Sequence, residues 1–460
     1  MSGKTTELRR DDNQFIHPWD DIAKLGENQR TVLERGDGVY VYDSDGHRLL
    51  DAPAGMWCVN IGHGREEMAQ AVYDQIMQLP YASPWSLTTG PAAQFSAQIA
   101  AEAPGDMNHV FFTTCGSTAV DSALRFVQFY NNVRGKPQKK GIIAHQKGYH
   151  GSTYLGASVS GKERDKNYLD FADDLVHHIP APHPLYKDPG QSDADFLEQC
   201  VANLEKQILQ TGPDNCAVFV SEPILASGGV IVPPEGYHAR CLELCRKYDM
   251  LYLSDEVVTG FGRLGHCFAS EAVFGIQPDL ITTAKGLTSG YVPMGAVLVS
   301  DRLLNELNAC GGDSTVFSNG FTYSGHPVAA AAGLKNLEIM KREKLFENVQ
   351  AVGPYFQQQL QTLRDIPIVS DVRGVGLMGC VECELNQGAG DLELDYELGN
   401  RIDKHCQALG LIVRPIINMC VMSPPLTINK DQIDEMILIL RSGVELAMQD
   451  CIDEGIWQPE

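Results

Sequence analysis

The sequence lacks several features that define broad classes of proteins. Its 460 residues contain no uninterrupted apolar run long enough to span a bilayer, and the first stretch, MSGKTTELRRDDNQ, lacks the apolar core of a signal peptide. Basic residues are scarce: 36 Lys and Arg stand against 59 Asp and Glu, and the formal net charge of -23 argues against nucleic acid or an anionic membrane as partner. Repeats and low-complexity segments are missing, while 43% hydrophobic residues exclude disorder. We therefore expect a soluble, cytoplasmic protein with a large core.

Cysteine is present, but without the pairing that a disulfide framework or a zinc site requires. The 13 cysteines are an odd number and lie in apolar segments such as PDNCAVFV, which is typical of buried thiols in a reducing compartment. Cys380 and Cys383 form a C-x-x-C, but they lie in the alternating, strand-like GLMGCVECEL, and no second ligand pair has suitable spacing. We expect structural thiols and no metal site.

Nucleotide-binding motifs are absent or lack their context. No G-x-x-x-x-G-K-[ST] occurs. Residues 260–265 and 374–379 match G-x-G-x-x-G, but a dinucleotide site requires a strand before the glycines and a helix after them. The first match leads into the non-helical HCFASEAVFG and the second into a strand-like segment. A nicotinamide-dependent oxidoreductase is therefore disfavoured.

The order of the expected elements indicates an α/β protein. The Asp-Gly turns of GVYVYDSDGHRLLDA predict a β-hairpin near the N-terminus. Short apolar strands then alternate with helical patterns, which is typical of a mostly parallel sheet covered on both faces. These strands are expected in NHVFFTT, KGIIAHQ, CAVFVSEP, MLYLSDEV, DLITTAK and GAVLVSD.

The rest of the chain predicts a smaller α+β domain. One long helix is expected from His326 to Leu363, then strands in IVSDVRGVGLMGCVECEL, LIVRPI and MCVMSPPL, and an amphipathic helix from Lys430. The expected division is an N-terminal arm with part of the small domain at 1–65, a large domain at 66–325, and an interdomain helix with the small C-terminal domain at 326–460.

A charged pair at strand ends is the first sign of a functional site. Asp255 ends the strand of MLYLSDEV, where a buried carboxylate is costly without a cationic partner, and Lys285 ends the next strand. Either could alone be a surface residue. Together they predict a pyridoxal phosphate enzyme, in which a lysine forms a Schiff base and an aspartate pairs with the pyridinium nitrogen. Ala284, Gly286 and Ser289 leave room beside Lys285 for a planar cofactor.

Two further segments offer partners for this cofactor. In TTCGSTAVDSALRFVQFY, Gly116 and Ser117 follow a strand and begin a helical pattern, so N–H groups and a hydroxyl would meet a phosphate at the positive helix end. Without context, the same residues are an ordinary helix cap. KGYHGST supplies Tyr149 and His150 as an aromatic lid, although a Tyr-His pair is more often packing.

These residues resemble class III (omega) aminotransferases. The segments that contain Asp255 and Lys285, DEVVTG and AKG, are similar to the family's signature, and YHGST, SEPI, FTYSGHP and RGVGLMG occur in the family's order. The likeness extends from about Trp19 to the last helix. It implies a fold-type I, aspartate-aminotransferase-like architecture with a large, mostly parallel domain and a small α+β domain. It also implies a homodimer with active sites at the subunit interface, alone or within a tetramer.

The resemblance also implies roles for residues around the cofactor. Val257 is expected to pack under the ring and Tyr149 to stack on its other face, while Glu222 of SEPI lies near the ring hydroxyl and the substrate. Gly116 and Ser117 would hold the phosphate, joined by Thr322 of FTYSGHP from the partner subunit.

The chain departs from the family's G-S-E-A-N at two positions. Thr118 and Val120 replace the glutamate and the asparagine, so two polar side chains behind the cofactor are lost. The glycine and serine of the motif are retained, which preserves the expected phosphate site.

Three residues are candidates for substrate binding. By the resemblance, Trp57 lies in an early loop that lines the substrate pocket, and Trp85 offers a second aromatic wall, although either could be a core residue. By the resemblance, Arg414 is the mobile arginine that binds a carboxylate and swings out for uncharged amines; the alternative is a structural ion pair. Apolar walls with a retractable arginine favour an amine or omega-amino acid:pyruvate aminotransferase. Its reaction would be ping-pong, with Lys285 carrying the proton between substrate and cofactor carbons.

Rival interpretations stay open. One is another class III activity: an ornithine or 4-aminobutyrate aminotransferase that uses 2-oxoglutarate, or a racemase or mutase. The others are the disfavoured nicotinamide oxidoreductase and a non-catalytic binding protein on the same scaffold. The presence of both Lys285 and Asp255 argues against the last.

Overall fold

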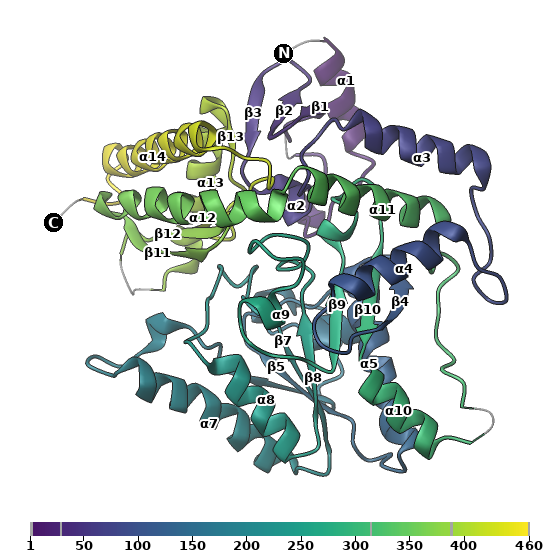
Figure 1. The fold of residues 1–460 in the computed structure, drawn as a ribbon. Coiled ribbons are helices and arrows are strands. Elements are labelled where there is room, and N and C mark those ends of the chain that lie inside the picture. The colour runs from purple at the N-terminus through teal and green to yellow at the C-terminus, as the bar shows by residue number, and fades with distance from the viewer. Residues whose placement is uncertain (1–2, 28–29, 313–314, 387–389, 459–460) are drawn as a thin grey trace.

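A seven-stranded sheet forms the centre of the computed structural model, which describes residues 3–27, 30–312, 315–386 and 390–458 (Figure 1). The strand order is β4-β10-β9-β8-β7-β5-β6, with β10 antiparallel to both neighbours and the other pairs parallel. The strands are β4 (His109–Thr113), β5 (Gly141–His145), β6 (Val176–Ile179), β7 (Cys216–Ser221), β8 (Leu251–Asp255), β9 (Leu280–Thr283) and β10 (Gly295–Val299). All six strands expected for this sheet are confirmed, and β6 is an addition that the sequence analysis missed.

Helices cover both faces of this sheet because successive side chains of a strand point to opposite sides. Leu253 of β8 packs into one buried cluster together with Leu124 of α5, whereas its neighbour Tyr252 packs into another together with Leu204 of α7. Figure 1 shows the two helical layers on either side of the strands. One layer contains α5 (Gly116–Val133), α6 (Tyr154–Val159) and α10 (Asp301–Cys310), and the other α7 (Asp193–Thr211) and α8 (Tyr237–Lys247).

Two smaller sheets lie at one end of the molecule, near the C-terminal helices (Figure 1). One has the order β1-β2-β3-β13 and contains the predicted hairpin of β2 and β3; the other has the order β11-β12-β14. Their strands are β1 (Leu33–Asp37), β2 (Tyr40–Asp43), β3 (Arg48–Asp51), β11 (Val369–Val375), β12 (Met378–Cys383), β13 (Leu411–Ile412) and β14 (Met419–Met422). Because β13 pairs in parallel with β3, the N-terminal strands join the C-terminal part of the chain.

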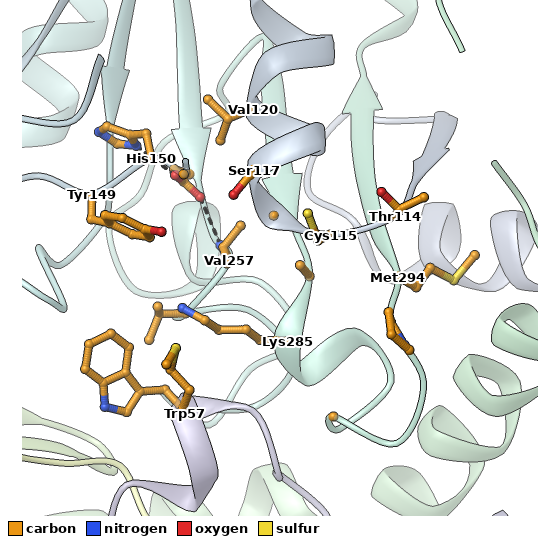
Figure 2. Close-up of a pocket in the computed structure, with 18 of the residues that line it drawn as sticks. Trp57, Thr114, Cys115, Ser117, Val120, Tyr149, His150, Val257, Lys285 and Met294 are labelled. Atoms are coloured by element: carbon orange, nitrogen blue, oxygen red, sulfur yellow. Dashed lines mark hydrogen bonds and ion pairs between the residues drawn. The ribbon is translucent and has the colours of Figure 1, made fainter. Parts of the chain in front are cut away.

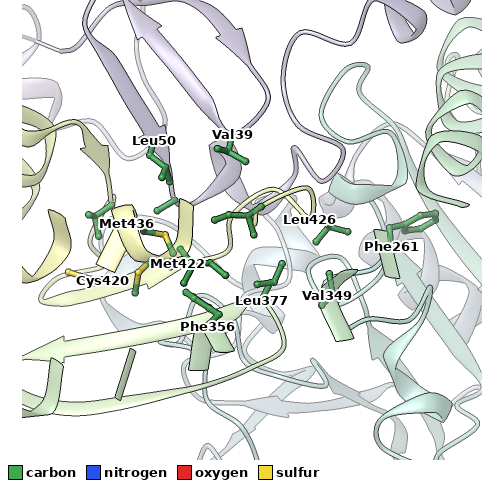
Figure 3. Packing of buried hydrophobic residues seen from close by; sticks show 14 of the residues in the cluster. Val39, Leu50, Phe261, Val349, Phe356, Leu377, Cys420, Met422, Leu426 and Met436 are labelled. Carbon is green, nitrogen blue, oxygen red and sulfur yellow. The ribbon is translucent and has the colours of Figure 1, made fainter. Parts of the chain in front are cut away.

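A single large cluster of apolar side chains joins these parts. Figure 3 shows Leu50 from the N-terminal strands beside Met422 and Met436 from the C-terminal elements, with Phe261 of the large sheet's loops at the other side. The remaining helices are α1 (Gly3–Asp12), α2 (Ala54–Trp57), α3 (Glu66–Gln78), α4 (Gly90–Glu102), α9 (Ala269–Ala272), α11 (Pro327–Arg342), α12 (Leu345–Gln361), α13 (Leu392–Leu409) and α14 (Lys430–Asp453).

The long helix expected from His326 to Leu363 is wrong as one element. The chain forms α11 and α12 instead, and Lys344 between them has a φ of 54°, which an α-helix cannot contain. The sequence did not reveal this break for two reasons. The apolar residues keep a helical spacing across it, and no glycine or proline stands at Lys344 to mark a helix end.

The α/β class is confirmed, with the parallel strands concentrated in one sheet. Cys380 and Cys383 lie on β12 with their side chains fully buried, and burial raises the pKa of both thiols. No helix within the described residues is both long and apolar enough to cross a membrane.

Candidate active site

A cavity at the carboxyl ends of the strands collects most of the predicted site residues. It has a volume of about 290 Å³ and is lined by segments that follow β4, β5, β7, β8 and β9. Open α/β sheets hold their ligands at this edge. Figure 2 shows Tyr149, Lys285 and Trp57 directed into one small volume. Of the predicted catalytic, cofactor-binding and substrate-binding residues, Trp85, Thr322 and Arg414 do not line this cavity, and neither do Gly286 and Ser289, which were expected to leave room for the cofactor.

Lys285 begins a 3-10 turn, and one residue, Ala284, separates it from the end of β9. Its φ of 45° lies in the left-handed region, which is uncommon outside glycine. Its Nζ lies 5.0 Å from the centroid of the Trp57 ring. Burial lowers the pKa of Lys285, although the charges of Asp255 and Glu222 act to raise it. A larger neutral fraction results, and the neutral amine is the form that attacks a carbonyl or accepts a proton.

Asp255 is held at the end of β8 by three neighbours. Its Oδ2 lies 2.7 Å from Nδ1 of His150, while its Oδ1 accepts hydrogen bonds from the Val257 N–H and the Thr282 hydroxyl. Asp255 and His150 are 4% and 2% exposed, so the pair is shielded from water. Burial acts to lower the pKa of His150, but the hydrogen bond to Asp255 and the charges of Asp255 and Glu222 together outweigh it, so that this pKa is raised. His150 therefore supports the carboxylate and is not the lid that the sequence suggested.

The N-terminus of α5 borders the cavity, and glycines keep it open. A Cβ on Gly116 would lie 3.1 Å from Cγ1 of Val257. A Cβ on Gly151, whose φ is +117°, would lie 2.6 Å from the Cα of Ser117. The Ser117 hydroxyl accepts a hydrogen bond from the Ser152 N–H, which ties the start of the helix to the loop after β5. The first N–H groups of a helix have no intrahelical acceptors and so can bind an anion.

The two departures from the family motif have clear structural roles. Thr118 is the third residue of α5 and completes a capping box with Cys115, since its hydroxyl accepts a hydrogen bond from the Cys115 N–H. Val120 is fully buried in the apolar cluster on that face of the sheet and also lines the cavity. The wall behind the cavity is therefore apolar at Val120.

Glu222 and Tyr149 shape the opposite side. The Glu222 carboxylate, 5% exposed, accepts hydrogen bonds from the N–H groups of Tyr149 and Ala226. Burial raises the pKa of Glu222 despite these bonds. The Tyr149 hydroxyl lies 3.0 Å from the Ser152 hydroxyl, which orients the ring at the cavity wall.

A second cavity, of about 430 Å³, adjoins the first and shares Trp57, Tyr149 and Lys285 with it. Arg414 lines this entrance cavity, and its guanidinium carbon lies 5.9 Å from the Trp57 ring centroid. No ion pair of the Arg414 side chain occurs within the described ranges, which argues against a purely structural role. Sequence reasoning missed Lys162 and Ser227 in this cavity, because nothing local marks them.

Trp85 and Thr322 lie elsewhere on the chain. Trp85 is 94% exposed and lines neither cavity, so it is not a wall of the pocket formed by its own chain. Thr322 is exposed as well, and its carbonyl accepts a hydrogen bond from the Tyr81 hydroxyl. Any role of these two residues at a cavity would need a second copy of the chain.

The groups that line the first cavity fit pyridoxal phosphate. The open N-terminus of α5 suits a phosphate, and Gly116 keeps the space in front of it free. The buried carboxylate of Asp255 suits a protonated ring nitrogen, and Lys285 provides an amine that can bond to an aldehyde.

Comparisons with known proteins agree with this geometry. The family model described as Aminotransferase class-III matches residues 22–444. The putrescine–pyruvate aminotransferase of Pseudomonas aeruginosa is 42% identical over 96% of this chain and 97% of its own length. An (S)-enantioselective omega-transaminase from Thermomicrobium roseum matches with a TM-score of 0.90 and 37% identity over 97% of this chain and 98% of its own. The omega-transaminase of Pseudomonas jessenii, solved in complex with PMP, matches with a TM-score of 0.91 and 33% identity, covering 96% of this chain and 98% of its own.

Proposed function

The chain belongs to the class-III aminotransferase family, and from that premise we propose that it moves an amino group from a primary amine or an omega-amino acid to pyruvate. It is a transaminase that depends on pyridoxal 5′-phosphate. The observation that carries the proposal is the placement of Lys285, an amine with a lowered pKa, in the same cavity as the buried carboxylate of Asp255. The relative that acts on putrescine and pyruvate supports the choice of acceptor.

The residues that would hold the cofactor follow from the cavity. Gly116 and Ser117 would bind the phosphate at the N-terminus of α5, Val257 and Tyr149 would bound the ring, and Asp255 would accept a hydrogen bond from its nitrogen. Glu222 and His150 would complete the polar side. When bound, the cofactor supplies an aldehyde that exchanges between amines and a ring that accepts the electron pair released at the substrate carbon.

Three side chains of the protein would then act on the bound substrate and cofactor: Lys285, His150 and Trp57. Once an incoming amine has released it, the neutral Lys285 amine would take a proton from the substrate carbon and deliver it to the cofactor carbon that carried the aldehyde, because burial has lowered the pKa of Lys285. His150 holds the Asp255 carboxylate in place through the 2.7 Å contact between its Nδ1 and Asp255 Oδ2, at the position where a cationic ring nitrogen would need a partner. Trp57 covers Lys285 and restricts the access of water to that amine.

The test of this proposal is the visible absorption of the purified holoenzyme. The cofactor band should bleach when butylamine is added without an acceptor and return when pyruvate follows, and initial rates should be ping-pong. Lys285→Ala should abolish both changes. If the band returns only with 2-oxoglutarate, the acceptor is 2-oxoglutarate and not pyruvate. Kinetics that require both substrates to be bound together would overturn the ping-pong transamination.

We also propose a homodimer in which each subunit completes the site of the other. The exposed Thr322 and Trp85 would reach the partner's cavity. An apolar surface supports this arrangement, because soluble monomers seldom expose so many large apolar groups together. Tyr81 donates a hydrogen bond to the Thr322 carbonyl, and its ring lies 6.1 Å from that of Tyr323. The large apolar side chains exposed in residues 73–87 and at 323 are Tyr73, Ile76, Met77, Leu79, Tyr81, Leu87 and Tyr323. The free state of all 13 cysteines supports a reducing, cytoplasmic location.

Complementation between two inactive variants tests the shared site. Lys285→Ala removes the amine, and Thr322→Glu places a carboxylate where it would repel the partner's cofactor phosphate. Refolding or co-expressing the two should restore about a quarter of the wild-type sites, because half of the dimers are mixed and each has one intact site. Full activity of the Thr322→Glu variant alone would refute the contribution of Thr322.

A further inference from the structure

The entrance cavity contains a lysine that the proposed chemistry has not used. Lys162 follows α6 and lines this cavity together with Arg414, Trp57 and Tyr149. Its Nζ lies 5.3 Å from the centroid of the Tyr149 ring. The side chain is half-buried, and within the part of the chain that the structure describes no carboxylate lies within ion-pair distance of it.

The backbone fixes the position of Lys162. The preceding residue, Gly161, hydrogen-bonds to both sides of the loop after β5: its N–H donates to the Gly148 carbonyl and its carbonyl accepts from the Lys147 N–H. A Cβ on Gly161 would lie 2.2 Å from the His145 carbonyl oxygen, so only glycine permits this approach. These contacts fix the backbone at Lys162, so its position next to Tyr149 is determined by the fold.

The nearby carboxylates are already occupied. Asp165, on the same segment, pairs with Arg164, its Oδ1 lying 3.4 Å from the arginine Nε. Glu222 accepts the two backbone N–H groups described above. The cavity thus holds two cations, Lys162 and Arg414, whose side chains have no anionic partner among the described residues, and a charge removed from water is costly without one.

Two buried polar atoms of the same cavity also lack a hydrogen-bond partner within the described residues. The hydroxyl of Ser227, 7% exposed, and the indole Nε1 of Trp57, 6% exposed, have no hydrogen-bond partner within the described residues. Both residues line the entrance cavity as well as the first one. Hydrogen-bond donors of this kind suit an anionic ligand with several acceptor atoms, such as a carboxylate.

We propose that Lys162 is a second recognition group of the substrate site, which binds the carboxylate of the keto acid together with Arg414 and gives up its proton to solvent when an amine without a carboxylate enters. This inference rests on the proposed transamination, since a ping-pong enzyme must admit an anionic acceptor and a cationic donor to one pocket in turn. An arginine stays charged throughout, so it must move to admit the donor. A lysine can change its charge in place.

The charges around Lys162 support this exchange. Burial, together with the charges of Arg164 and Arg414, lowers the pKa of Lys162 to about 8, although the charges of Asp165 and Glu222 act to raise it. Tyr149 faces it with the ring, while Lys285 and Tyr396 line the same cavity. A bound carboxylate raises this pKa and keeps the ammonium, whereas a second cation favours the neutral amine.

Half-reactions of the holoenzyme separate the two substrates. Lys162→Met removes the charge at similar length, and Lys162→Arg fixes it. Lys166→Met is the control, because Lys166 lies on the same segment, pairs with Glu163 and does not line the cavity. Lys162→Met should weaken pyruvate binding about tenfold at pH 7 without weakening that of butylamine, whereas Lys162→Arg should retain pyruvate binding and weaken that of butylamine.

A second readout does not depend on turnover. Calorimetric titration of the holoenzyme with propionate, in two buffers of different ionisation enthalpy, measures protons taken up on binding. The wild type should take up about half a proton at pH 8, since half of Lys162 is then neutral, and its affinity should fall as pH rises above 8. Neither Lys162 variant should show this uptake.

The outcomes distinguish the two proposals. Absence of any half-reaction in the wild type would overturn the transamination, whatever Lys162 does. A wild type that transaminates, with unchanged pyruvate binding and unchanged proton uptake in Lys162→Met, would overturn the role of Lys162 alone. Equal losses for Lys162→Met and Lys166→Met would show a general effect of charge and would overturn it as well.

Discussion

The strained turn that carries Trp57 makes the most specific prediction about this site. Ala54, Gly55 and Trp57 have φ values of 46°, 68° and 60°, so three residues of one short turn are left-handed. Two of them are not glycine, and such residues cost about 1–3 kcal/mol each. Something outside the turn must therefore hold it.

The holding group is the carboxylate of Asp51, at the end of β3. Its two oxygens lie 3.0 and 2.8 Å from the Gly55 nitrogen, whose N–H they accept, and its Oδ2 lies 2.8 Å from Nε2 of His63. Asp51 is 3% exposed, so these bonds do not compete with water. A hydrogen bond to a charged group contributes about 1.5–3 kcal/mol, which is comparable to the strain of the turn.

Asp51→Ala should therefore release the turn and move the Trp57 ring away from Lys285. We expect kcat/KM with butylamine and pyruvate to fall ten- to a hundredfold, about 1.4–2.8 kcal/mol at tenfold per 1.4 kcal/mol. Asp51→Asn is the matched control. The amide oxygen of the asparagine can still accept a hydrogen bond from the Gly55 N–H. His63 can change tautomer so that its Nε2 accepts a hydrogen bond from the amide NH₂, and kcat/KM should therefore fall less than about tenfold.

A double-mutant cycle provides the refutation. If Asp51 acts through Trp57, then Asp51→Ala should cost much less in a Trp57→Ala background than in the wild type. Thermal unfolding of each variant, followed in parallel, separates a loss of positioning from a loss of fold. Additive losses of activity, with Asp51→Ala equally harmful in both backgrounds, would show that the turn does not position Trp57 for the reaction.

Four further predictions concern the cofactor side of the cavity. Asp255→Asn should lower kcat at least about a hundredfold in steady-state assays, because a neutral amide cannot keep a ring nitrogen protonated. Gly116→Ala should weaken cofactor binding about tenfold in equilibrium titration, since the new Cβ would crowd Val257 at 3.1 Å. The pKa of His150 is raised in the folded protein, so the stability that His150 contributes is fully present below its unfolded-state pKa and is lost as pH rises through its folded-state pKa. Denaturant unfolding of wild-type and His150→Gln apoenzyme between pH 5.5 and 8.5 should therefore give a difference in free energy of unfolding that shrinks as pH rises. Val120→Asn should lower the free energy of unfolding by about 1–3 kcal/mol, because its amide would lie in an apolar cluster.

The sequence predicted which residues meet at the first cavity for a definite physical reason. Parallel strands bring their carboxyl ends to one edge, so residues that follow strands, such as Asp255, Glu222 and Lys285, must meet there. Strand patterns are local, and the edge they share follows from topology. The positions of these side chains thus needed no knowledge of long-range contacts.

The entrance half was predicted poorly because local patterns do not encode it. Lys162 reaches the cavity only through the contacts of Gly161 with a loop earlier in the chain, and Asp51 holds the Trp57 turn across the end of β3. Trp85 was assigned to the site as an aromatic wall and Thr322 from the resemblance, yet one chain leaves both exposed. Interactions of this kind appear only in three dimensions or in the assembly.

The entrance cavity is also where residues with an unfavourable backbone conformation are concentrated. Among the residues that the structure describes, thirteen non-glycine residues have a positive φ, and five of them line the entrance cavity: Trp19, Trp57, Lys285, Arg414 and Ile417. Left-handed residues cost free energy, so their concentration here means that the surrounding fold stabilises an arrangement that the local chain disfavours. Substitutions at the entrance therefore change local strain as well as contacts, and a variant made there to alter substrate choice can gain stability while it loses position. Changes in activity at this end of the pocket are consequently informative about recognition only when unfolding is measured on the same variants.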